Sequence, residues 1–161
     1  MENKNNEQLY LFHQGTYYQA YEYMGAHPCP DGKGYVFRTW APNASRINVV
    51  GDFNGWNNTK NPMKKISDGG VWEAVVQDAK QFDKYKFEIV DKNNYARLKA
   101  DPYAFMNETN GKTASIVYDI KGYNWNDQGY LKYRNHKNNY ETPMNIYEVN
   151  FGSWKKQSDC S

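Results

Sequence analysis

Hydrophobic and polar residues alternate with a period of two through the middle of the chain. The pattern is clearest from Lys84 to Val90, where one set of positions carries Tyr85, Phe87 and Ile89. Because successive side chains of a strand point to opposite faces, this alternation predicts a half-buried β-strand. Similar patterns predict strands at residues 35–41, 46–51, 71–77, 95–99 and 115–118.

Turn residues separate these predicted strands. They include Asn54-Gly55, Asp68-Gly69-Gly70, Asn93-Asn94 and Asn110-Gly111. Glycine and asparagine favour turns because they adopt left-handed backbone conformations easily. Short strands with no long helices between them are typical of an antiparallel sandwich. We therefore expect a mainly β fold, with residues 34–120 as the sandwich.

The segments on either side of the predicted sandwich lack its alternating pattern. In residues 1–33, an N-terminal extension, Thr16 and Gln19 have capping-box spacing, which predicts a short helix from Tyr17 to Met24 that ends at Gly25. Residues 121–143 read as a linker with a short helix near 127–134. The last piece, residues 144–161, contains an apolar-rich strand at 144–149 with no evident partner. We expect such a strand to self-associate or to belong to a disordered tail from about residue 141.

Composition narrows the function classes. The 161 residues include 15 Tyr, 7 Phe and 5 Trp at a net charge of +2, so large rings supply the core volume. We expect no membrane span, no secretory signal and no nucleic-acid partner, since no long apolar run, leader pattern or basic run is present. Cys29 and Cys160 make no disulfide framework, which favours a reducing, cytoplasmic location.

The sequence shows no spacing typical of a catalytic or metal-binding motif. Asp52, Asp91 and Asp101 lie near strand ends or turns, and no spacing marks two of them as a hydrolytic pair. His13, His27 and Cys29 lack the spacing of a zinc site. We therefore expect no catalytic residue, no metal and no cofactor in this chain.

The segment Gly51-Asp-Phe-Asn-Gly-Trp-Asn57 is the most informative candidate for binding. It places Trp56 in a loop directly after a predicted strand. The indole either folds back over the sheet edge or forms a flat platform for a sugar, whose C–H face packs on an aromatic ring. Hydrogen-bonding groups beside the platform would come from Asn54, Asn57, Lys86 and Asn94. Lys86 could equally be a solvated surface lysine, and Tyr95 is either a second platform or a residue of the sheet packing.

Longer stretches resemble the N-terminal region of glycogen (1,4-α-glucan) branching enzymes, over about residues 9–158. The resemblance rests on Tyr35-Val-Phe-Arg-Thr-Trp-Ala-Pro-Asn-Ala44, Ile47–Asn57, Phe12-His-Gln-Gly-Thr16, Lys99–Ala104 and Pro143–Trp154. It implies that residues 34–120 are a family-48 carbohydrate-binding module with an immunoglobulin-like β-sandwich. In such modules the residues matching Trp56, Lys86 and Tyr95 contact α-1,4-glucan, as in glycogen and maltooligosaccharides.

The resemblance also bears on the end of the chain. Met144 to Trp154 resembles the first strand of the (β/α)8 catalytic barrel, whose three catalytic acids would lie downstream. On this basis we expect an inactive fragment whose partner is the missing barrel. The alternatives are a structural spacer that binds no sugar, a stand-alone glycogen-binding module and a debranching relative.

Overall fold

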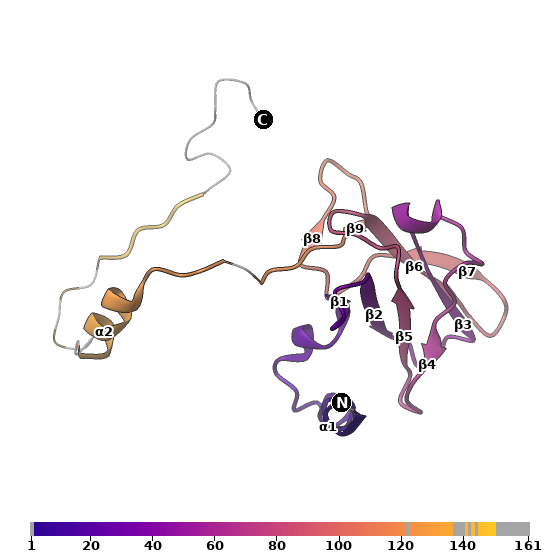
Figure 1. The fold of residues 1–161 in the computed structure, drawn as a ribbon, viewed down its shortest axis with the longest axis horizontal. Coiled ribbons are helices and arrows are strands. Elements are labelled where there is room, and N and C mark those ends of the chain that lie inside the picture. Colours follow the sequence, from indigo (N-terminus) through magenta and orange to yellow (C-terminus); the bar gives the residue numbers. More distant parts are fainter. Residues whose placement is uncertain (1, 122, 137–140, 142, 144, 151–161) are drawn as a thin grey trace. The chain divides into compact units, whose positions relative to one another are not determined.

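The computed structural model describes residues 2–121, 123–136, 141, 143 and 145–150. It divides into two units, the first ending at Lys121. The first unit holds two antiparallel sheets (Figure 1). One has the strand order β1-β2-β5-β4, and the other has the order β3-β6-β9-β8, with β7 also paired to β6. The fold is therefore the expected immunoglobulin-like β-sandwich.

The strands agree closely with the alternation in the sequence. The first sheet contains β1 (Gly25–Pro28), β2 (Tyr35–Trp40), β4 (Lys64–Lys65) and β5 (Val71–Val76). The second contains β3 (Arg46–Gly51), β6 (Lys84–Val90), β7 (Ala96–Lys99), β8 (Met106–Asn107) and β9 (Ser115–Ile116). All six predicted strands are present. The short β1, β4 and β8 were not predicted, because two to four residues show no usable period.

Large side chains fill the space between the sheets. Phe37 of β2 and Tyr85 of β6 meet edge to face, with ring centroids 5.0 Å apart. Ile47, Val49 and Phe87 are also fully or almost fully buried. They occupy alternate positions of β3 and β6, as the period of two predicts. The aromatic residues thus supply the core that the small number of aliphatic residues could not.

The predicted helix at 17–24 is wrong. Only a 3-10 turn, η1 (Ala20–Glu22), forms there, and an α-helix, α1 (Glu2–Gln14), precedes it. Gly15 donates its N–H to Phe12 O, and Thr16 donates its N–H to Leu11 O, both at 3.1 Å, with Gly15 at φ +71°. These bonds form a Schellman motif, which ends a helix. Thr16 therefore follows the end of the first helix instead of capping a second one.

Helix α1 lies against the first sheet. Leu9 and Phe12 pack on a small buried cluster that contains Met24 and Val71. His13 shares a hydrogen bond of 2.9 Å between its Nε2 and Ser67 Oγ. Strand β1 follows η1 and pairs with β2 from Gly25 to Pro28, so this sheet begins before residue 34. Pro28 fits there because an edge strand tolerates a residue without an N–H.

The second unit contains α2 (Gln128–His136), which confirms the predicted helix near residues 127–134. Leu131 donates its N–H to Asp127 O at 2.9 Å, which closes the first turn. Residues 145–149 of the predicted terminal strand are not in a strand, since a strand is defined by its ladder with a neighbour. Met144 and residues 151–161 of the expected tail lie outside the described residues.

Candidate functional site

Trp56 is held at the surface by the turn that follows β3. The chain leaves β3 at Gly51, makes the 3-10 turn η2 (Asp52–Asn54), and passes through left-handed conformations at Gly55 and Trp56, at φ +64° and +60°. The indole Nε1 donates to Asp52 Oδ1 at 3.0 Å. Asp52 Oδ2 accepts a second hydrogen bond, from Lys84 N at 2.9 Å. One carboxylate therefore ties the indole to the start of β6.

A shallow groove of about 650 Å³ runs beside the indole. We call it the Trp56 groove, and its lining is Val50, Gly55, Trp56, Asn57, Asn58, Thr59, Glu88 and Leu98. Trp56 is 40% exposed, so part of the ring remains accessible to a ligand. Leu98, which is 53% exposed, adds apolar surface beside it, and the almost fully buried Val50 lies beneath the groove. The groove thus offers an aromatic and aliphatic surface edged by amide and hydroxyl groups.

Strand register explains why these residues meet. Val50 pairs with Lys86, and Glu88 pairs with Asn48 of β3 and with Leu98 of β7. Side chains at these positions point away from the core, on the outer face of the second sheet. Glu88 is almost fully buried because its two carboxylate oxygens accept bonds from Asn48 Nδ2 at 2.7 Å and Asn58 Nδ2 at 2.8 Å. This bonding fixes the polar floor of the groove.

Lys86 lies next to the groove. Its register partner Val50 lines the groove, and its Nζ donates to Thr113 Oγ1 at 2.6 Å. An ammonium group has three donors, so this bond directs the side chain and still leaves donor capacity for a ligand. Lys86 therefore lies at the same end of the sheet as Trp56, next to the Trp56 groove but not in its lining.

Asn54 cannot serve as expected. Its Oδ1 accepts a bond from Gly51 N at 3.0 Å, and its Nδ2 donates to Val49 O and Asn61 Oδ1 at 3.0 and 2.7 Å. The side chain is buried. It holds the turn together instead of facing a ligand, and we withdraw it from the site. Asn57 does line the groove, where its Oδ1 accepts bonds from Thr59 N and Thr59 Oγ1.

Tyr95 and Asn94 also lie away from the Trp56 groove. They belong to the β6–β7 hairpin, where Asn94 N and Tyr95 N bond to Asp91. The hairpin follows Val90, whereas Trp56 and Lys86 lie at the opposite end of β6. At about 3.3 Å per residue, Tyr95 is roughly 17 Å from Lys86 along the strand direction. The structure therefore does not bring Tyr95 and Asn94 to the Trp56 groove.

Sequence reasoning missed Leu98, Asn58, Thr59, Glu88 and Thr113. Leu98 occupies the outward position of β7 that faces the groove, so it provides the second apolar surface expected from Tyr95. Its signal in the sequence was the alternation of residues 96–99, which places Leu98 on the same side as Ala96. Asn58 and Thr113 lie in loops, and no local sequence pattern predicts their contacts.

The described part of the chain has neither a metal-binding cluster nor a membrane-spanning helix. Within that part of the chain, no three His, Cys, Asp or Glu side chains gather in a way that could hold a metal ion. No described helix has the length and apolar character needed to span a bilayer.

Comparison with known proteins places the chain in a family. The family model for carbohydrate-binding module 48 (isoamylase N-terminal domain) matches residues 23–104, which include Trp56, Lys86 and Leu98. The chain belongs to the carbohydrate-binding module 48 family. A solved pullulanase of Anoxybacillus sp. LM18-11, complexed with maltotetraose, has a TM-score of 0.50 and 26% identity over 60% of this chain and 14% of that chain.

The similarity extends further among curated relatives. The 1,4-alpha-glucan branching enzyme GlgB of Bacillus caldolyticus is 47% identical over 159 residues, which are 98% of this chain and 24% of that protein. The corresponding enzyme of Halothermothrix orenii is 47% identical over 152 residues, 93% of this chain and 24% of its own length. The chain thus spans about a quarter of the length of the curated relatives it matches.

Proposed function

We propose that this chain binds α-1,4-glucan through the Trp56 groove. The observation that carries the proposal is the indole of Trp56, held by Asp52 with 40% of its surface exposed, beside Leu98 and a rim of amide groups. An aromatic plane packs against the C–H face of a sugar ring, and amide and ammonium groups satisfy its hydroxyls. The family model and the branching-enzyme relatives support the same ligand class.

We also propose that the chain is the N-terminal part of a 1,4-α-glucan branching enzyme. The support is 47% identity over almost the whole chain to one quarter of such enzymes. In the whole protein, a catalytic barrel would transfer α-1,4-glucan segments to form α-1,6 branches, and the module would hold the glucan. The barrel is then the module's partner, and we place the protein in the cytoplasm.

Binding is tested on the full 161-residue chain by titrating maltoheptaose while following tryptophan fluorescence. We expect a saturable change that Trp56→Ala weakens at least tenfold, a loss of about 1.4 kcal/mol of binding free energy. Trp125→Ala is the matched control, because Trp125 is exposed in the second unit. A fluorescence change that survives Trp56→Ala would refute binding at the groove.

A structural spacer is the second candidate function. The bonds from Trp56 and Lys84 to Asp52 favour it, since they also stabilise the turn without any ligand. If the module is only a spacer, Trp56→Ala lowers the free energy of unfolding and the wild-type chain shows no saturable response to maltoheptaose. The same titration therefore separates the two functions.

A further inference from the structure

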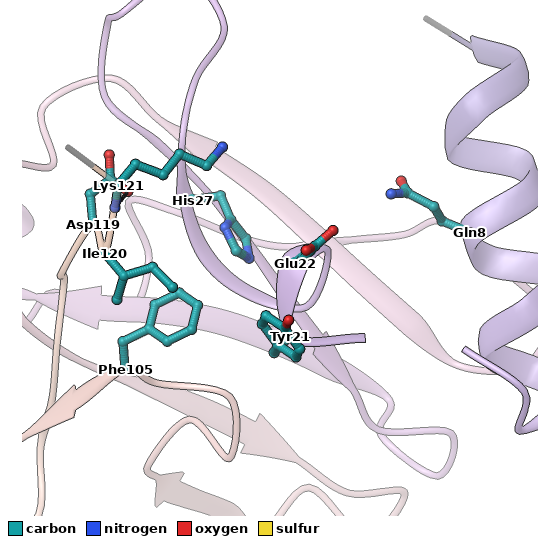
Figure 2. Close-up of a pocket in the computed structure, with 8 residues that line it drawn as sticks. All are labelled: Gln8, Tyr21, Glu22, His27, Phe105, Asp119, Ile120 and Lys121. Carbon is teal, nitrogen blue, oxygen red and sulfur yellow. Dashed lines mark hydrogen bonds between the residues drawn. The ribbon is translucent and has the colours of Figure 1, made fainter. Parts of the chain in front are cut away.

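A second pocket, of about 510 Å³, is lined by residues of α1, η1 and β1, by Phe105 just before β8 and by residues after β9. We call it the His27 pocket, since His27 of β1 lies at its centre (Figure 2). The segment Asp119–Lys121 and the side chain of Glu22 lie on opposite sides of His27 in that view. Its volume is within the range of small-molecule sites.

The pocket and the Trp56 groove are separate. The pocket is lined by β1, by Phe105 just before β8, and by residues after β9, whereas the groove lies over β3, β6 and β7. In the second sheet β3 and β8 are the opposite ends of the strand order. Three strand spacings of about 4.8 Å separate them by roughly 14 Å.

Aromatic rings form the apolar part of the pocket. Tyr21 and Phe105 meet edge to face with ring centroids 6.5 Å apart, and His27 and Phe105 do the same at 6.0 Å. Tyr21 is 43% exposed, so its ring offers surface to a ligand. The exposed ring of Tyr21 is the kind of surface on which the C–H face of a sugar packs, and Phe105 supports it from behind.

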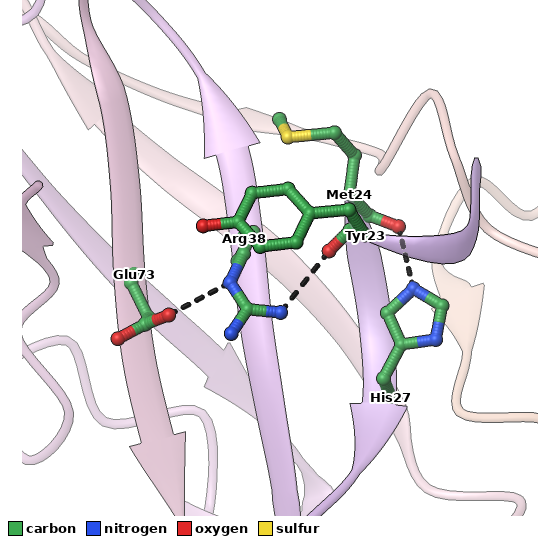
Figure 3. A network of polar contacts seen from close by, with 5 residues as sticks. All are labelled: Tyr23, Met24, His27, Arg38 and Glu73. Carbon is green, nitrogen blue, oxygen red and sulfur yellow. Dashed lines mark hydrogen bonds and ion pairs between the residues drawn. The ribbon is translucent and has the colours of Figure 1, made fainter. Parts of the chain in front are cut away.

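A polar network holds the segment from Tyr23 to His27 in place. Arg38 Nη1 donates to Tyr23 O at 3.2 Å, and His27 Nε2 donates to Met24 O at 2.8 Å (Figure 3). Arg38 is itself paired with Glu73 at 2.7 Å and lies 4.2 Å from the ring centre of Tyr23. These bonds fix the chain directly after Tyr21 and Glu22 and orient the ring of His27.

Charge around the pocket restricts the ligand class. Glu22 and Asp119 are acidic and Lys121 is basic, while burial lowers the pKa of His27 and keeps the ring neutral at pH 7. The lining therefore carries a net negative charge, which disfavours phosphates and other anions. Sugar hydroxyls both donate and accept, so they satisfy the carboxylates, Lys121 and Gln8 together.

We propose that the His27 pocket is a second α-glucan site, which binds a short stretch or an end of a glucan chain. This inference rests on the glucan specificity of the proposed function, but it uses different residues. A branched polymer presents many ends, so two sites on one module would raise the affinity for the polymer above that for a short oligosaccharide.

The experiment follows backbone amides of the full chain by two-dimensional NMR during titration with maltoheptaose. We expect two sets of shifts, one around residues 21, 22, 27 and 119–121 and one around residues 55–59 and 98. Tyr21→Ala should raise the dissociation constant of the first set at least tenfold and leave the second unchanged. Trp56→Ala should do the reverse, and Tyr18→Ala, which removes a tyrosine that is 90% exposed, should change neither.

The outcomes separate the two proposals. Shifts of the groove amides alone would overturn the second site and leave the proposed function standing. Shifts of the pocket amides alone would support the second site and overturn binding at the groove, and no shifts would overturn both. Glu22→Gln checks the pocket without removing a ring, and it should also weaken the first set. Pocket shifts with an arginine-rich peptide but not with maltoheptaose would show that the pocket binds cations instead.

Discussion

Asp52 accepts hydrogen bonds from Trp56 Nε1 at 3.0 Å and, through its second oxygen, from Lys84 N at 2.9 Å. This carboxylate couples the exposed ring to the sheet. An indole free to rotate would have to be ordered when a ligand binds, at a cost in entropy. The hydrogen bond that the indole donates to Asp52 orders the ring beforehand, so Asp52 acts on binding without needing to touch the sugar.

Replacing Asp52 by alanine should therefore weaken binding and stability together. Two hydrogen bonds are lost at an exposed position, and we expect a decrease of about 1–2 kcal/mol in the free energy of unfolding. The dissociation constant for maltoheptaose should rise severalfold. Urea unfolding and calorimetric titration measure the two effects, with Asp31→Ala, which removes the acceptor of a bond from Lys33 N in another turn, as the control. Unchanged binding in Asp52→Ala would show that the ring needs no support.

Asn54 and Asn57 should separate stability from binding. Asn54→Ala leaves Gly51 N and Val49 O without their side-chain partner inside the turn, so we expect a loss of about 3 kcal/mol of unfolding free energy. Asn57→Ala removes an exposed side chain of the groove and its two bonds from Thr59, so it should weaken maltoheptaose binding and lower the unfolding free energy by only about 1 kcal/mol. Urea midpoints and dissociation constants of both variants decide this. An Asn54→Ala chain as stable as the wild type would contradict the structural role.

Leu98 should matter for binding and Tyr95 should not. Leu98 lines the groove, and Tyr95 lies in the hairpin at the other end of β6. We expect Leu98→Asp to weaken maltoheptaose binding about tenfold, because it puts a solvated charge where the sugar face would pack. Tyr95→Asp puts the same charge at an exposed residue of the hairpin and should change the dissociation constant less than twofold. A larger loss of affinity in the Tyr95 variant than in the Leu98 variant would show that Tyr95 belongs to the site.

Asp101 should make the chain more stable at mildly acidic pH. Burial raises the pKa of Asp101 to about 6, although Tyr85 OH, at 2.6 Å from Oδ2, and Tyr103 N favour the charged form. The folded state then binds the proton more tightly than the unfolded chain, whose pKa is near 3.8. The resulting contribution to the free energy of unfolding is fully present below pH 3.8 and is lost as the pH rises through 6. Its size is about 3 kcal/mol.

Asp101→Asn should flatten this part of the pH profile. Unfolding free energies measured in urea from pH 4 to pH 8 would show it, because the wild-type contribution of this group falls across that range and the variant has no such proton. The variant Asp91→Asn, at a partly exposed turn, is the control and should retain the slope. A slope that persists in Asp101→Asn would assign the titration to another group.

The sequence by itself determined the strands, the sandwich and the position of the exposed indole. Alternation from Lys84 to Val90 is a local property, since each side chain of a strand faces the core or solvent according to its parity. The prediction of a helix at residues 17–24 was wrong because Gly15 and Thr16 are compatible with both the end of one helix and the start of another. Only the backbone bonds to Leu11 and Phe12 show that a helix ends there.

Only the tertiary structure decided which residues share the site. The register of β3, β6 and β7 sets Val50 beside Lys86 and Leu98 beside Glu88, and sends Tyr95 to the far end of the sheet. Register depends on pairing between segments that lie tens of residues apart, so no local pattern encodes it. Burial likewise turned Asn54 from a surface amide into a support of the turn, because its three bonds form only when the chain folds back on itself.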